Sequence, residues 1–181
     1  MTRLGYVMTT CCVAPLSAFL AFVPVVPKLI WNASASAPIG LYAIAPARHL
    51  DVTDLVVIQA PPPLANFLAG RGYLPRGVPL MKRIAALPGQ QVCREGCDIT
   101  INGLAMGEAL DSDRIGRSLP SWQGCRVLAA GEIFVMNWDV RDSLDGRYFG
   151  PIPSSSIVGR ALPLWTDEGG DGRYQWRAPT R

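Results

Sequence analysis

The sequence predicts a mainly β domain that follows one N-terminal membrane-spanning helix. Three observations lead to this prediction: an uncharged apolar run at the N-terminus, several short strand-like segments after it, and frequent prolines and glycines that end helices and strands. The chain has 181 residues, and its 16 prolines and 18 glycines interrupt it often. A chain of this length holds one domain and a small appendage. We therefore expect an anchor at 1–30, a β-rich domain at 31–165 and a loosely packed tail at 166–181.

The N-terminal segment 4–27 contains no charged residue. As a helix these 24 residues would extend roughly 36 Å, which exceeds the ~30 Å hydrocarbon core of a bilayer. Arg3 precedes the segment and Lys28 follows it, and this weak bias favours a cytoplasmic N-terminus with an exported body. The alternative is a cleavable secretion signal that ends in the small-residue run 33–37, and this alternative exports the body as well.

Short segments with strand-like composition follow Trp31. Apolar and β-branched runs predict strands at four places: 55–59, 80–87, 132–137 and 156–162. Segments 91–94 and 98–101 have the pattern of a strand pair, and Asn102-Gly103 is the strongest turn signal in the chain. Beyond the anchor, only 64–73, which follows three prolines, favours a helix.

The composition excludes several function classes. A net charge of +3 is too small to predict a nucleic-acid-binding surface. His49 is the only histidine, so a multi-histidine metal site is excluded and a histidine-based triad would have to use this residue. Its neighbours Arg48 and Asp51 favour a surface loop. We therefore expect no metal.

The cysteines agree with an exported domain. Cys11 and Cys12 lie in the apolar segment, where cysteine behaves as a small hydrophobic residue. Cys93 and Cys97 have a spacing that a tight turn can close into a disulfide, which leaves Cys125 without a partner. Three scattered cysteines beside one histidine do not give the paired spacing of a structural zinc site.

Lys82 is the first residue that could carry chemistry. Strand alternation places it on the same face as Leu80 and Ile84. Burial lowers the pKa of a lysine by at most ~3–5 pH units, so a buried amine is neutral and can act as a base near neutral pH. The alternative is an ammonium group that reaches water from the edge of a sheet.

Ser34 and Ser36 follow the apolar segment at a spacing of two. In an extended segment both hydroxyls lie on one face, so one serine can attack while the other donates a hydrogen bond. A serine hydroxyl needs a base before it attacks a peptide. Because the chain has one histidine, the available base is Lys82. The alternative is a polar linker next to the membrane.

A third polar cluster lies within 137–151, and its members are Asp139, Asp142, Ser143, Asp145 and Arg147. Asp145 and Arg147 are close enough along the chain for an ion pair that fixes a loop. The alternative is a solvated turn. Glycoside hydrolysis by paired carboxylates is a weaker hypothesis, because the segment shows no sugar-binding aromatic pattern.

Together and in this order, the three segments resemble the type I signal peptidase superfamily with its Ser–Lys dyad, above all the TraF-type peptidases of conjugative transfer systems. Segment 36–42 looks like the nucleophile box, 82–89 like the general-base box and 143–151 like the box that supports the lysine. Segment 72–75 is also typical of the conjugative branch. The resemblance covers residues 5–163 and implies a signal-peptidase-like β-rich catalytic domain.

The resemblance implies a mechanism without a cofactor. Neutral Lys82 takes the proton from the Ser36 hydroxyl, and Ser36 attacks the scissile carbonyl. The Ser36 backbone N–H and the Ser34 hydroxyl stabilise the oxyanion. The residues implied to support the lysine and its loop are Ser143, Asp145 and Arg147.

The resemblance also implies a substrate and a location. The expected protein is a serine endopeptidase of the bacterial inner membrane with a periplasmic catalytic domain, and its N-terminal helix contacts lipid. Its expected substrate is an exported pilin-type precursor, either hydrolysed or joined into a ring. Ala37 stands where general signal peptidases usually have Met, and 137–141 replaces their Gly-Asp-Asn-Arg motif. Two alternatives stay open: a general type I signal peptidase, and a non-catalytic anchored β scaffold of a secretion complex.

Overall fold

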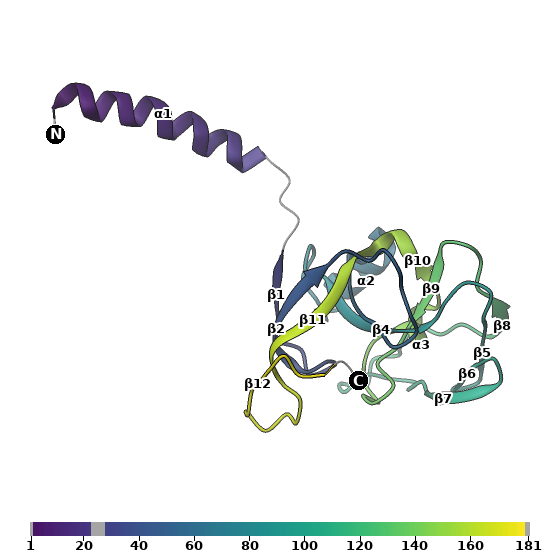
Figure 1. Cartoon of the computed structure of the whole chain (residues 1–181). Helices are drawn as coiled ribbons and strands as arrows, with labels where there is room; N and C mark the ends of the chain where they lie inside the picture. Colours follow the sequence, from purple (N-terminus) through teal and green to yellow (C-terminus); the bar gives the residue numbers. More distant parts are fainter. Residues whose placement is uncertain (1, 23–27, 180–181) are drawn as a thin grey trace.

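The structure is a computed structural model that describes residues 2–22 and 28–179. Its β-rich body consists of two antiparallel sheets, which confirms the mainly β prediction (Figure 1). The larger sheet contains β1 (Leu29–Asn32), β2 (Ile39–Ala45), β3 (Leu55–Ile58), β4 (Leu80–Ala86), β9 (Glu132–Val135), β10 (Ile152–Pro153), β11 (Ile157–Asp167) and β12 (Gln175–Trp176). The smaller sheet contains β5 (Gln91–Glu95), β6 (Asp98–Ile101), β7 (Leu104–Glu108) and β8 (Gly124–Val127).

The strand order places β4 inside the larger sheet. That order is β1-β2-β11-β3-β4-β9-β10, with β12 beside β11, and the smaller sheet has the order β7-β6-β5-β8. Four short runs predicted as strands correspond to β3, β4, β9 and β11, and the predicted pairing of 91–94 with 98–101 is the β5–β6 pair. Asn102-Gly103 turns the chain from β6 into β7, with both residues at positive φ.

The helices are α1 (Arg3–Phe22), α2 (Pro62–Gly70), α3 (Gly146–Phe149) and the 3-10 turn η1 (Ser154–Ser156). Helix α2 confirms the helix predicted after the three prolines, with Pro62 and Pro63 in its first turn, where the missing N–H groups have no helical partner. Helix α1 contains Pro15 and projects from the β-rich body (Figure 1).

The predicted membrane-spanning helix overlaps α1, and residues 23–27 of the predicted segment lie outside the described residues. Within the part of the chain that the structure describes, no helix combines the length and the hydropathy that crossing a bilayer requires. Segment 166–181, predicted as a loosely packed tail, begins inside β11 with the buried residues Thr166 and Asp167, and it supplies β12.

Strand β9 lies between two hydrophobic cores. Its residues Ile133 and Val135 belong to a core formed with β3, β4 and α2, while Phe134 and the following Met136 belong to a core formed with the smaller sheet. Because alternate side chains of a strand point to opposite faces, β9 is buried on both sides. Its neighbour β4 contributes to both cores as well, through Ile84 and Ala85.

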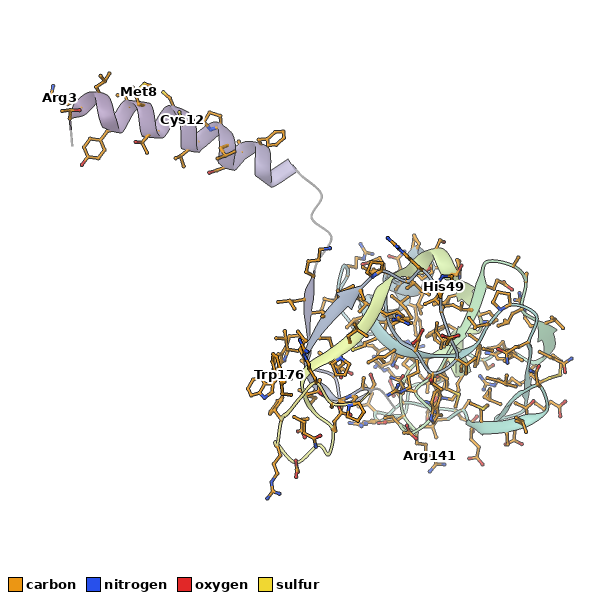
Figure 2. The ribbon with its side chains drawn as sticks, in the orientation of Figure 1. Arg3, Met8, Cys12, His49, Arg141 and Trp176 are labelled. Carbon is orange, nitrogen blue, oxygen red and sulfur yellow. A yellow bond between two sulfur atoms is a disulfide. The ribbon has the colours of Figure 1, made fainter. Side chains whose placement is uncertain are left out.

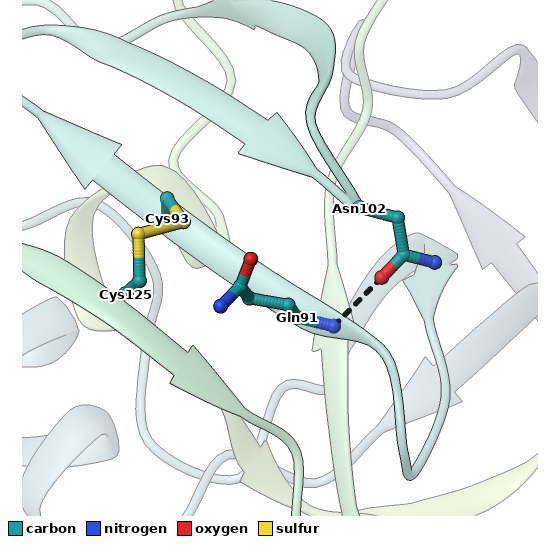
Figure 3. The surroundings of a disulfide bond; sticks show 4 residues. All are labelled: Gln91, Cys93, Asn102 and Cys125. Carbon is teal, nitrogen blue, oxygen red and sulfur yellow. Dashed lines mark hydrogen bonds between the residues drawn. A yellow bond between two sulfur atoms is a disulfide. The ribbon is translucent and has the colours of Figure 1, made fainter.

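The disulfide prediction was wrong, because Cys93 is bonded to Cys125 (Figure 3). The two residues are directly paired in the β5–β8 ladder, with their Cα atoms 4.0 Å apart. Cys97 is a free thiol at the end of the β5–β6 turn, where its Sγ lies 3.7 Å from Asp111 Oδ1. The hairpin register pairs Cys93 with Thr100, so it displaces Cys97 along the ladder from Cys93.

The Asn102 side chain fixes the β5–β6 ladder at the end opposite the turn that contains Cys97. Its Oδ1 accepts a hydrogen bond from the Gln91 backbone N–H at 2.9 Å (Figure 3). The Asn102 backbone N–H in turn donates to the Gln91 carbonyl. This paired contact extends the β5–β6 ladder, in which Cys93 lies opposite Thr100.

Replacing both Cys93 and Cys125 with alanine should destabilise the domain. The disulfide closes a loop of 32 residues, and the restricted unfolded chain contributes roughly 3–4 kcal/mol at most. The measurement is the urea midpoint of unfolding, with Cys97→Ser as the matched control, which should leave the midpoint near the wild-type value. A Cys93–Cys97 linked peptide in a non-reducing digest would contradict the assignment.

Candidate active site

Lys82 lies in the middle of β4, where its side chain is only 3% exposed. Strands β3 and β9 flank β4, so the side chain does not reach water from a sheet edge. Its Nζ donates a hydrogen bond to Ser143 Oγ at 2.7 Å. Burial lowers the pKa of Lys82 to about 8, while the negative charge of Asp145 raises it and the positive charge of Arg147 lowers it. A substantial fraction of the amine is therefore neutral at mildly alkaline pH.

The loop that carries Ser143 is organised around the Arg147 guanidinium, which is 1% exposed. Its N–H groups donate to three loop carbonyls within 3.1 Å, those of Val140, Arg141 and Ser143. Two longer bonds reach the carbonyls of Glu108 and Asn137. A planar group with five fixed donors can hold several carbonyls at once, so Arg147 determines the shape of the loop.

Asp145 is fully buried and pairs with Arg147. The Arg147 side chain donates to both Asp145 oxygens at 2.9 Å, and the Arg147 and Asn137 backbone N–H groups donate to the same carboxylate. These donors satisfy the carboxylate, as a buried charge requires. Gly146 packs so closely on β9 that an added Cβ would lie 2.7 Å from the Val135 carbonyl oxygen. The predicted support residues therefore form one connected unit beneath Lys82.

Ser34 and Ser36 lie together in the turn between β1 and β2. Their hydroxyl oxygens are 2.9 Å apart, and the Ser36 backbone N–H donates to Ser34 Oγ at 3.3 Å. Ser34 is exposed and Ser36 is half-buried, so this edge of the turn faces solvent. The two donors predicted for an oxyanion thus converge at one place.

Asn32, which the sequence analysis did not select, gives this turn its shape. The side chain is buried, and its Nδ2 donates to the carbonyls of Ser34, Ala37 and Pro38. Its Oδ1 accepts a hydrogen bond from the Ser34 backbone N–H at 3.0 Å. Asparagine at the end of a strand often bonds to the backbone that follows, and this tendency is the signal that could have indicated Asn32.

Asn137, the second residue not selected, connects the serine turn to β4. Its Nδ2 donates to the Ser36 carbonyl and, at 3.3 Å, to the Met81 carbonyl. Its Oδ1 accepts a hydrogen bond from the Arg83 backbone N–H at 2.9 Å. The backbone on either side of Lys82 and the backbone of Ser36 therefore meet at one side-chain amide.

The remaining polar residues lie outside this group. Asp142 is exposed and pairs with Arg114, and Asp139 is exposed. His49 is exposed in the loop between β2 and β3, well separated in Figure 2 from Arg141 of the Ser143 loop. Within residues 2–22 and 28–179, no group of three or more His, Cys, Asp or Glu side chains is placed to hold a metal ion.

Comparisons with known proteins identify the family of the chain. A family model described as signal peptidase, peptidase S26, matches residues 1–165. The conjugal transfer protein TraF of Agrobacterium fabrum is 36% identical over 146 residues, and the plasmid transfer protein TraF of Escherichia coli is 33% identical over 149 residues. Both alignments cover 75% of this chain and 81% of the relative.

A solved structure is also similar in part. The crystal structure of a signal peptidase I from Enterococcus faecalis V583 aligns with a TM-score of 0.37 and 20% identity, over 62% of this chain and 97% of that chain. The family assignment rests on the family model and the two TraF relatives, not on this alignment. By those two findings, the chain belongs to the signal peptidase family, peptidase S26.

Proposed function

We propose that the protein is a serine endopeptidase in which Ser36 is the nucleophile and Lys82 is the general base. The observation that carries this proposal is the buried Lys82 amine, which has a lowered pKa and a hydroxyl partner in Ser143. Burying a lysine is costly for the fold, so a buried lysine with a lowered pKa is a candidate functional residue. The shared contacts of Asn137 with the Ser36 and Met81 carbonyls support the pairing of the two residues.

The proposed reaction begins with proton transfer. Neutral Lys82 takes the proton from Ser36 Oγ while Oγ forms a bond to the scissile carbonyl carbon. The resulting ammonium group returns the proton to the leaving amine as the peptide bond breaks, which leaves an acyl-enzyme on Ser36. Ser143 keeps the Lys82 amine oriented through both steps, because it holds Nζ at 2.7 Å.

The oxyanion would be stabilised by Ser34 and the Ser36 backbone. The Ser36 N–H donates to Ser34 Oγ in the structure. We infer that the scissile oxygen takes over this N–H when substrate binds, and that the Ser34 hydroxyl then donates to the same oxygen. Loss of one such donor typically slows a reaction by ~10²–10³-fold.

The proposed substrate is an exported pilin-type precursor of a conjugative transfer system. This proposal is supported by the TraF relatives, which are named as conjugal and plasmid transfer proteins. The acyl-enzyme can be resolved by water, which gives a linear product, or by the free amine of the same pilin, which gives a ring. We propose attachment to the bacterial inner membrane through the uncharged N-terminal segment, with the catalytic domain in the periplasm.

Ser36→Ala and Lys82→Met should each abolish cleavage of the pilin-type precursor while leaving the fold intact. Loss of a general base costs about 10²–10⁴-fold, and loss of the nucleophile costs at least as much. The measurement is initial-rate cleavage with the purified full chain. Ser155→Ala, at an exposed serine of η1, and Lys28→Met, at the only other lysine, are the matched controls and should cleave normally. Normal cleavage by Lys82→Met would rule out the dyad.

Cleavage should increase with pH through an apparent pKa near 8, because only the neutral Lys82 amine accepts the serine proton. The measurement is kcat/KM between pH 6 and 10. Asp142→Asn should move the midpoint to lower pH, since the Asp142 charge raises the Lys82 pKa. A flat profile between pH 6 and 9 would argue against a lysine base.

The protein should cleave a conjugative pilin precursor and leave ordinary secretory precursors intact. Ala37 is buried and directly follows the proposed nucleophile Ser36. General signal peptidases usually have Met at this position, so this protein should differ from them in substrate choice. Mass spectrometry of the products separates hydrolysis from ring closure, because a ring is lighter than the linear product by one water. Equal cleavage of secretory precursors would favour a general signal peptidase, and no cleavage of any precursor would favour a scaffold.

A further inference from the structure

The Asn137 carboxamide uses both of its N–H donors and its oxygen on three backbone groups of two other segments. Its two N–H groups donate to the Ser36 and Met81 carbonyls, and its Oδ1 accepts from the Arg83 N–H. A primary amide has two donors and one acceptor oxygen, so the side chain matches these partners without leaving a donor unused. Asn137 is also 4% exposed, so water does not compete for these bonds.

The same side chain takes the place of a strand. Strand β9 ends at Val135, and the last backbone contact with β4 is the Met136 N–H donating to the Arg83 carbonyl. One residue later, the Asn137 amide supplies the acceptor for the Arg83 N–H and a donor for the Met81 carbonyl. The ladder next to Lys82 is therefore continued by a side chain, which leaves one further N–H directed at the serine turn.

We propose that Asn137 is a positioning residue that docks the Ser36 turn onto β4 at the level of Lys82. This inference rests on the proposed Ser–Lys peptidase and adds the group that holds nucleophile and base in register. Asn32 shapes the serine turn from within, whereas Asn137 is the side-chain contact that joins the turn to the strand of the base. The backbone N–H of Asn137 binds Asp145 and is unaffected by side-chain substitution.

A displaced nucleophile reduces the chemical step more than it reduces binding. A misplacement of about 1 Å can cost 10²-fold in rate, because proton transfer and attack both require close contact. Aspartate at this position would keep the shape and the acceptor for Arg83 but would offer no donor to either carbonyl. Its negative charge next to Lys82 would also stabilise the ammonium form.

The test compares Asn137→Ala and Asn137→Asp with Asn66→Ala, an exposed asparagine of α2. For Asn137→Ala we expect kcat to fall by about 10²-fold, with KM and the midpoint of the pH profile close to those of the wild type. For Asn137→Asp we expect the same loss and a midpoint at higher pH. The control should match the wild type in all three measurements.

Hydrogen exchange measured by mass spectrometry on the same proteins tests the docking directly. Both Asn137 variants should exchange the amides of 33–37 faster than the wild type, while the β3 amides keep their protection as evidence of folding. Wild-type kcat in a folded variant, or unchanged exchange of 33–37, would overturn the assignment to Asn137. An inactive wild-type protein, or an active Ser36→Ala variant, would instead overturn the proposed peptidase, and the exchange result would still decide the role of Asn137.

Discussion

The structure depends on the enclosure of one amine, that of Lys82, inside the larger sheet. An ammonium group in this position loses its hydration, so the fold stabilises Lys82 best when the amine is neutral. The single hydroxyl of Ser143 then provides the partner that a buried amine needs. Lys82 lies on a strand that contributes residues to both hydrophobic cores, so the strand that carries the amine is packed on both faces.

The smaller sheet contributes to this site through the loop that carries Ser143. Arg94, which is buried beside Cys93 in β5, donates to the Arg147 carbonyl at 2.6 Å. Arg147 in turn holds Asp145 and the carbonyls of the Ser143 loop. The Cys93–Cys125 disulfide lies one residue before Arg94 and joins β5, which carries Arg94, to β8. The second sheet therefore acts as a support for the loop that orients the amine.

The sequence allowed prediction of the features that depend on local pattern. Alternation placed Lys82 among apolar neighbours and left two alternatives, a buried amine or one that reaches water. The spacing of Asp145 and Arg147 likewise allowed either an ion pair or a solvated turn, and the structure shows the buried amine and the ion pair. Features that depend on long-range register could not be predicted. Cys93 meets Cys125 because β8 pairs with β5, and no local signal specifies that pairing. Asn137 was missed because its amide binds backbone groups that only the folded chain brings near, whereas the partners of Asn32 are local and could have been anticipated.

The most direct test of the central claim is the titration of Lys82 itself. The chain has two lysines, Lys28 and Lys82, so protein labelled with ¹³C and ¹⁵N at lysine gives two side-chain NMR signals, which a Lys28→Arg variant assigns. Our account predicts that the Lys82 signal titrates with a midpoint near 8. A midpoint at the ordinary lysine value of 10.5 would show that the buried amine stays charged, and it would contradict the proposed role as a general base.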